Sequence, residues 1–282
     1  MKGKFDTSMK KIKRYKTIVL SDIHLGSKWS KTKEVTRFLK ENMCDTLILC
    51  GDIIDGWNLM RGKKVKWKKS HTKFIKLLLD LQHDTEIIYI KGNHDDFLDR
   101  ILPMTFQNIH VVKDYLYTSG DKRFYVIHGD IFDSVTSHLS WLSKIGDVGY
   151  SLLLWMNKYY NNRRKKRGLP YYSISREIKK KMKASVSYIS DYEKHIVDIA
   201  KQKKCDGVIC GHIHHPEKRY YDDVLYMNSG DWVESLSALT ETYDGNWEVV
   251  YYRQGSLSKN TEEAMSKQKT ELPSNINLAI SL

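Results

Sequence analysis

The stretch Thr46-Leu47-Ile48-Leu49-Cys50-Gly51-Asp52 decides the fold, because it joins a short apolar run directly to a glycine and a carboxylate. An apolar run rich in aliphatic and β-branched residues is typical of a strand that is buried on both faces. Four other stretches have the same form and reach an Asp, Asn or His at their ends: 17–22, 87–94, 124–130 and 208–212. Such strands, separated by helical segments, predict an α/β architecture.

Helical and further strand patterns surround these runs. Residues 31–42 and 71–83 have the spacing of amphipathic helices, and in the second one Phe74, Leu77, Leu78 and Leu81 form one apolar stripe. Near the C-terminal end, the spacing of apolar residues predicts hairpin strands at 224–228, 236–243 and 247–252.

The alternation of strands and helices defines one domain, which we expect to cover residues 14–253. It is interrupted at 131–205, where helical patterns, Trp and Leu residues and basic runs predict an inserted helical cap. Residues 1–13 are polar and basic, and we expect a flexible arm there. Residues 254–282 lose their periodicity and gain polar residues, so we expect a disordered tail.

The composition of the chain indicates the kind of partner and the cellular compartment to expect. Its 282 residues include 47 Lys and Arg against 34 Asp and Glu, a formal net charge of +13, which favours an anionic partner. Four cysteines in a chain of this length indicate free thiols and a reducing compartment. The sequence shows neither a secretory signal nor a membrane-spanning run, so we expect a cytoplasmic protein that could also lie on the cytoplasmic face of the membrane.

Polar residues follow the predicted strands at the place where α/β proteins build their sites. Sites in open α/β sheets form outside the carboxyl ends of strands, so these residues can meet in one crevice. A single Gly-Asp pair would be ordinary turn chemistry, but five strand ends of this kind argue against that explanation. The candidate metal ligands are Asp22, His24, Asp52, Asn93, His128, His212 and His214.

The ligand types indicate a particular class of metal. Carboxylate oxygens combined with imidazole nitrogens suit Mn, Fe or Zn better than Mg or Ca. No cysteine occurs in the set, which argues against a structural zinc site. Seven ligands exceed the need of one ion and suit two ions that share a carboxylate.

These strand ends, taken in order, resemble the signature of the calcineurin-like metallophosphoesterases. The matching blocks are Ser-Asp22-Ile-His24, Gly51-Asp52, Gly92-Asn93-His94-Asp95, His128-Gly-Asp and Gly211-His212-Ile-His214. Four further segments look like the bacterial UDP-2,3-diacylglucosamine diphosphatases and their paralogues: 51–57, 127–133, 210–216 and 230–235. The resemblance covers roughly residues 15–253.

The resemblance implies a layered α/β/β/α fold and a dinuclear centre, usually of manganese. It places Asp22, His24, Asp52 and His214 on one ion. It places Asp52, Asn93, His128 and His212 on the other, with Asp52 as the bridge.

The resemblance also assigns two catalytic residues. It implies that His94 faces the leaving group and that Asp95 orients His94. In the best-known diphosphatases an Arg stands at the position of His94, so the exact substrate stays open. We assign no role to Asp231 and Trp232. Asp55 is a candidate for the lining of the pocket, and Trp57 either lines the pocket or belongs to the core.

The function expected on these grounds is a two-metal phosphohydrolase. The nearest reaction is the cleavage of UDP-2,3-diacylglucosamine to UMP and a lipid 1-phosphate, a step of lipid A synthesis. An apolar and basic cap could rest on an acidic membrane surface. One alternative is a nuclease or nucleotide phosphodiesterase, in which basic and Tyr residues bind phosphates and stack bases. Another is a non-catalytic binding module, although such modules typically lose ligands and this sequence keeps all of them.

Overall fold

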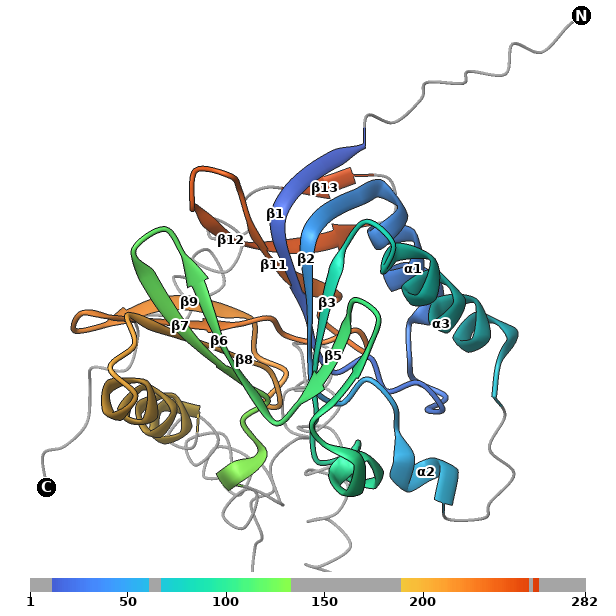
Figure 1. Cartoon of the computed structure of the whole chain (residues 1–282), viewed down its shortest axis with the longest axis horizontal. Coiled ribbons are helices and arrows are strands. Elements are labelled where there is room, and N and C mark those ends of the chain that lie inside the picture. Colours follow the sequence, from blue (N-terminus) through green and yellow to red (C-terminus); the bar gives the residue numbers. More distant parts are fainter. Residues whose placement is uncertain (1–11, 61–66, 133–188, 254–255, 259–282) are drawn as a thin grey trace, which may run out of the picture.

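The computed structural model describes residues 12–60, 67–132, 189–253 and 256–258, which form two sheets with helices outside them (Figure 1). The larger sheet has the strand order β13 (Ser256–Ser258), β12 (Trp247–Arg253), β11 (Ser237–Glu241), β1 (Lys13–Leu20), β2 (Asn42–Cys50), β3 (Glu86–Ile90), β5 (Ile109–Val112) and β4 (Met104–Phe106). The smaller sheet has the order β6 (Asp114–Ser119), β7 (Lys122–Ile127), β8 (Gly207–Cys210), β10 (Val224–Asn228) and β9 (Glu217–Tyr221).

The predicted apolar runs form the parallel centres of both sheets. Strands β1, β2, β3 and β5 run parallel in the larger sheet, and β7, β8 and β10 run parallel in the smaller one. The last four residues of β1 and of β2 are buried, as expected for strands that are covered on both faces. The parallel arrangement places the carboxyl ends of the strands at one edge of each sheet.

Apolar side chains fill three spaces between successive layers. Helices α1 (Thr32–Glu41) and α3 (Lys69–Leu81) cover the outer face of the larger sheet, where Phe38 and Phe74 are fully buried. Between the sheets, Ile48 and Ile88 of one pack with Val126 and Met227 of the other. A helix over residues 189–202 covers the smaller sheet. The layered α/β/β/α fold is therefore confirmed.

The elements agree closely with the sequence patterns where both can be compared. The helices predicted at 31–42 and 71–83 are α1 and α3, and the three C-terminal strands are β10, β11 and β12. Ser256–Ser258 form the short strand β13 against β12, inside the segment for which we expected disorder. Pairing with a neighbouring strand orders this piece despite its polar sequence.

Most of the predicted cap, arm and tail lies outside the described residues, namely 133–188, 1–11 and 259–282. No helix in the part of the chain that the structure describes is long and apolar enough to cross a membrane. The four cysteines are free thiols, and three of them are buried.

Candidate metal centre

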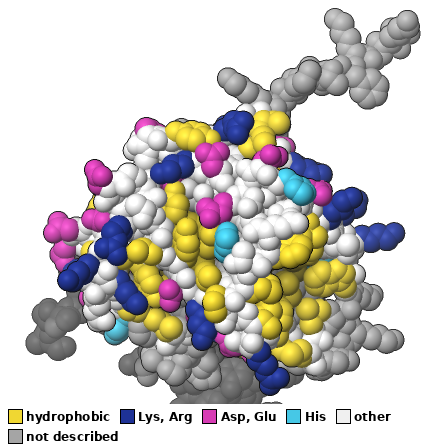
Figure 2. All heavy atoms as spheres, in the orientation of Figure 1, with side chains coloured by type: hydrophobic (Ala, Val, Ile, Leu, Met, Phe, Trp, Pro, Cys, Tyr) yellow, Lys and Arg dark blue, Asp and Glu magenta, His cyan; other side chains and the backbone are white. Residues whose placement is uncertain are grey.

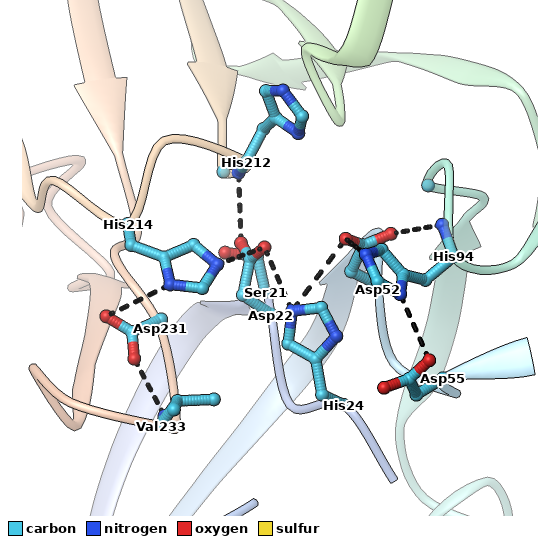
Figure 3. A network of polar contacts seen from close by, with 12 residues as sticks. Ser21, Asp22, His24, Asp52, Asp55, His94, His212, His214, Asp231 and Val233 are labelled. Carbon is cyan, nitrogen blue, oxygen red and sulfur yellow. Dashed lines mark hydrogen bonds and ion pairs between the residues drawn. The ribbon is translucent and has the colours of Figure 1, made fainter. Parts of the chain in front are cut away.

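The candidate ligands lie on the loops that leave the carboxyl ends of the parallel strands. Asp22 and His24 follow β1, Asp52 follows β2, and His212 and His214 follow β8. Backbone hydrogen bonds join these loops directly, since Asp22 N–H donates to Gly51 O at 3.0 Å and Gly211 N–H donates to His128 O at 3.1 Å. Residues far apart in sequence thus meet at one place (Figure 3).

The backbone of these loops is strained at the ligands themselves. Five candidate ligands have φ in the left-handed region: Asp22 (53°), His24 (51°), Asp52 (55°), His212 (69°) and His214 (53°). This region is unfavourable for residues with a side chain, and strain of this kind gathers at functional sites. The fold therefore stabilises a costly geometry where the polar side chains converge.

Two glycines of the motifs allow the ligands to approach one another. A Cβ atom on Gly92 would overlap Oδ1 of Asp52, and a Cβ atom on Gly51 would overlap the ring of His128. Gly51 also has a φ of +83°, a conformation that glycine adopts without steric cost. These glycines are required for the packing around the Asp52 carboxylate as well as for the turns.

Asp22 holds one side of the centre. Its Oδ1 lies 3.0 Å from Nε2 of His214 and 3.7 Å from Nε2 of His24. Its Oδ2 accepts a hydrogen bond from the backbone N–H of His212 at 3.0 Å, while the ring of His212 points away from this carboxylate (Figure 3). Asp22, His24 and His214 offer ligand atoms that lie within 4.8 Å of one another.

Asp52 lies between the two sets of residues that the resemblance assigned to two ions. Its Oδ2 is 3.8 Å from Nε2 of His24, and its Oδ1 is 3.4 Å from Nε2 of His128. Asp22, Asp52 and His128 form a second group of ligand atoms within 4.8 Å of one another. The ring of His212 lies on the side of His128, with a centroid distance of 5.1 Å.

Two buried polar atoms on the loops after β3 and β7 fit a cation. Oδ1 of Asn93 and Nε2 of His128 are buried, and neither makes a hydrogen bond to any residue that the structure describes. Nδ1 of His128 donates to Cys50 O at 2.9 Å, so Nε2 faces the centre and offers its lone pair to a cation once its proton is released. Buried polar atoms without a partner are costly, and a divalent cation would satisfy both. The residues present therefore fit a site for divalent metal ions.

Charge pairing within the centre shifts the pKa values of its groups. Burial favours neutral forms, but the opposite charge of His128 holds the pKa of Asp52 at about 2. The pKa of Asp22 lies well below its usual range, because the contacts with His214 and His24 outweigh burial. Burial likewise opposes the charged forms of His128 and His214, but Asp52 and Asp22 raise their pKa values to about 10 and about 9.

His94 borders the centre and has a different carboxylate partner from the one predicted. Its Nδ1 lies 3.1 Å from Oδ1 of Asp55, its Nε2 lies 3.9 Å from Asp52, and Trp57 stacks on its ring at 4.1 Å. Asp95, which the resemblance assigned to orient His94, is fully buried and makes its hydrogen bonds to other residues.

The contacts of Asp95 explain this difference. It accepts hydrogen bonds from the backbone N–H groups of Ile53, Ile54 and Gly92, and from the hydroxyl of Tyr89. Burial and the nearby Asp52 charge raise its pKa to about 6. Asp95 therefore holds together the loops after β2 and β3, and Asp55 is the carboxylate that contacts the ring of His94.

The block at 230–232, to which the sequence analysis assigned no role, contacts His214 and the loop that carries Asp22. Asp231 is fully buried, and its Oδ2 lies 4.0 Å from Nδ1 of His214. The N–H of Trp232 donates to Asp22 O at 3.1 Å, and the hydroxyl of Ser21 donates to Gly230 O at 2.7 Å. The Gly-Asp form of the block, shortly after β10, was the available signal, because it repeats the pattern of the other strand ends.

Solved structures that are similar to this chain include phosphoesterases and Vps29 proteins. Vps29 of Cryptosporidium parvum is 10% identical, with 86% of this chain and 93% of that chain covered and a TM-score of 0.43. An archaeal phosphodiesterase is 15% identical, with 83% and 98% covered and a TM-score of 0.41. The phosphoesterase YfcE of E. coli is 15% identical, with 84% and 99% covered and a TM-score of 0.38. Likenesses this weak assign no activity.

The family comparison is more specific. A search of curated proteins found no significant match. The profile of the calcineurin-like phosphoesterases matches residues 15–216, which is more than half of the chain and includes every candidate ligand. The chain therefore belongs to the calcineurin-like phosphoesterase family.

Proposed function

We propose that this metal-dependent phosphoesterase is a two-metal phosphohydrolase that cleaves the pyrophosphate bond of a nucleotide-linked lipid. The nearest substrate is UDP-2,3-diacylglucosamine, with UMP and a lipid 1-phosphate as products. The observation that carries the two-metal proposal is the position of Asp52, whose carboxylate lies 3.8 Å from His24 on one side and 3.4 Å from His128 on the other.

Two divalent ions would fit two sets of ligands that share Asp52. Asp22, His24 and His214 would complete one set, and Asn93, His128 and His212 the other. Oxygen and nitrogen ligands favour Mn²⁺, with Fe or Zn as alternatives. Such ions, when bound, lower the pKa of a water molecule and neutralise charge on phosphoryl oxygens.

His94 is the residue that would act on the leaving group. Its ring borders the Asp52 carboxylate but is not needed in either ligand set. Asp55 accepts a hydrogen bond from Nδ1–H, which presents Nε2 to the centre and favours a protonated ring. A protonated His94 can donate to the oxygen that leaves as the bond to phosphorus breaks.

Apolar side chains beside His94 support a substrate with acyl chains. Trp57 stacks on the ring of His94. It is the second residue of the short helix α2 (Gly56–Met60), directly after Gly56. A Cβ atom on Gly56 would overlap the ring of Phe97, so the 3₁₀ helix η1 (Asp96–Ile101) packs closely against α2. Leu59, Met60 and Phe97 are exposed on these two helices. A lipid would remove this surface from water, which is favourable.

The decisive experiment is a substrate panel on purified protein with added Mn²⁺. The panel should contain UDP-2,3-diacylglucosamine, a cyclic nucleotide, bis(p-nitrophenyl) phosphate and single-stranded DNA, with Asp52→Asn as the inactive control. Release of UMP at the highest kcat/KM supports the proposal. Hydrolysis of DNA or the cyclic nucleotide instead would assign a nuclease or nucleotide phosphodiesterase. Metal-loaded protein that hydrolyses nothing would indicate a binding module.

A further inference from the structure

Six exposed residues that lie near the metal centre in the sequence form a surface of three Lys, two Trp and one Leu side chain. We call it the Trp–Lys face: Lys28, Trp29, Leu59, Trp67, Lys68 and Lys69. Trp29 is 63% exposed, which is unusual for the largest apolar side chain and indicates a contact surface. Trp67 and Leu59 are 41% and 39% exposed.

Contacts join the three segments that carry this face into one surface. Lys68 Nζ donates to Lys28 O at 3.0 Å, and Lys28 Nζ lies 4.6 Å from the ring centroid of Trp29. The side chain of Leu59 lies over Gly26, in the same loop as Lys28 and Trp29, since a Cβ atom on Gly26 would touch Leu59 Cδ2 at 3.4 Å. The three segments therefore lie side by side.

The charge of these segments has one sign. Residues 26–33 hold three Lys and residues 67–76 hold four, so with 56–60 the three segments hold seven Lys and neither Asp nor Glu. In Figure 2, Lys and Arg side chains project along the edge of the molecule where α3 lies, and a group of hydrophobic side chains lies near them. A surface of this kind attracts a dense negative charge.

We propose that the Trp–Lys face docks on the surface of an anionic phospholipid bilayer. Trp side chains prefer the level of lipid headgroups, and lysines extend to anionic headgroups while their stems remain in apolar surroundings. Leu59 and the 62% exposed Met60 favour a bilayer over a nucleic acid. They have no ring on which a base can stack, whereas an acyl layer would bury them.

Docking in this way would place the metal centre at the membrane. Gly26 lies two residues after His24, and Leu59 lies in α2, four residues after Asp55, so only short stretches of chain separate the face from the centre. A lipid-linked substrate could then reach His94 with its acyl chains partly held in the bilayer. This consequence rests on the proposed function, but binding to vesicles does not.

The test measures binding of the full chain to phosphatidylcholine vesicles with and without phosphatidylglycerol, by co-sedimentation without substrate. We expect binding to the anionic vesicles only, and weaker binding as salt rises. The variant K28E/K68E/K69E should bind on the order of a hundredfold more weakly, because each lysine near an anionic surface contributes about fivefold. The matched control K122E/K194E/K204E changes charge equally on the side of the smaller sheet and should keep most of the binding.

Fluorescence separates insertion from simple charge attraction. The tryptophan fluorescence emission of the wild type should shift to shorter wavelength when anionic vesicles are added. W29F/W67F should lose most of this shift, because the two Trp side chains enter the headgroup region. Hydrolysis of soluble bis(p-nitrophenyl) phosphate by K28E/K68E/K69E should equal that of the wild type, which shows that the charge changes leave the site intact.

Three results would overturn the proposal. The first is the absence of binding to anionic vesicles at low salt. The second is an equal loss in both triple variants, which would assign binding to net charge rather than to this face. The third is binding of single-stranded nucleic acid that K28E/K68E/K69E abolishes while vesicles do not bind. None of these results depends on whether UDP-2,3-diacylglucosamine is hydrolysed, so the proposed function is tested separately.

Discussion

Nδ1 of His94 lies 3.1 Å from Oδ1 of Asp55, so the carboxylate that orients this histidine comes from the loop after β2 and not from its sequence neighbour Asp95. Asp55 is itself fixed, because its Oδ1 accepts a hydrogen bond from Asn58 N–H at 3.0 Å. The pair joins the loop that carries Asp52 to the loop that carries His94.

Asp55→Asn should lower kcat about tenfold to a hundredfold while the bound metal stays constant, since the loss of an outer carboxylate has effects of this size. Although burial lowers the pKa of His94, the contact with Asp55 raises it. Without that charge, the pH at which His94 loses its proton should fall, and the alkaline limb of the kcat profile should move to lower pH. An unchanged pH profile with a reduced kcat would contradict this role.

Asp95→Ala should act on stability. The substitution leaves three backbone N–H groups and the Tyr89 hydroxyl without their acceptor, and each such buried donor costs about 1–3 kcal/mol. We expect the free energy of unfolding in urea to fall by at least about 3 kcal/mol. If Asp95→Ala kept full stability and lost only activity, the assignment of the two carboxylates would have to be reversed.

Asp52→Asn should remove metal as well as activity, because its carboxylate faces both ligand sets. We expect a loss of metal content by elemental analysis and a fall in kcat/KM of at least about a hundredfold, the upper value for outer partners of ligands. The exposed Asp223→Asn is the matched control and should retain both. Full metal content in Asp52→Asn would remove the bridging assignment.

Gly92→Ala should prevent metal binding without a change of charge. The added methyl group would overlap Oδ1 of Asp52, so this carboxylate or the loop must move. Gly120→Ala is the control, since nothing lies within 4 Å of the added atom and only its φ of +56° opposes the change. In metal titrations, Gly92→Ala should bind metal much more weakly than Gly120→Ala. Equal metal affinities of the two variants would show that the loop adapts to the added methyl group.

The metal-free protein should lose stability as the pH rises. The pKa values of His128 and His214 are raised to about 10 and about 9, above the ordinary 6.5, so the folded state binds these protons more tightly than the unfolded chain. The stabilisation is complete below about pH 6.5 and is lost as the pH rises through 9 and 10.

Binding of Mn²⁺ near pH 8 should release protons from these two histidines. Calorimetry in buffers of different ionisation enthalpy measures that release, and thermal melts from pH 6 to pH 10 measure the loss of stability. The absence of proton release would show that the histidines are neutral before metal binds.

The strands and the ligand types could be predicted from the sequence because both are local properties. A continuous apolar run such as 47–50 can be buried on both faces only in the centre of a sheet, and the polar residue that follows must then lie at a strand end. The residues of the five blocks and their order along the chain also indicated the family, because both can be read directly from the sequence. The strand β13 was missed because its pairing with β12 is absent from its own sequence.

The sequence by itself therefore determined the layered fold, the seven candidate ligands and the family. Only the tertiary structure decided that Asp55 and not Asp95 contacts His94, and that Asp231 lies behind His214. It also brought Trp29 and Trp67 onto one face, although 37 residues separate them in the chain. The physical reason is that side-chain direction at a loop depends on its backbone dihedral angles and on the hydrogen bonds of neighbouring loops. Local sequence patterns specify neither.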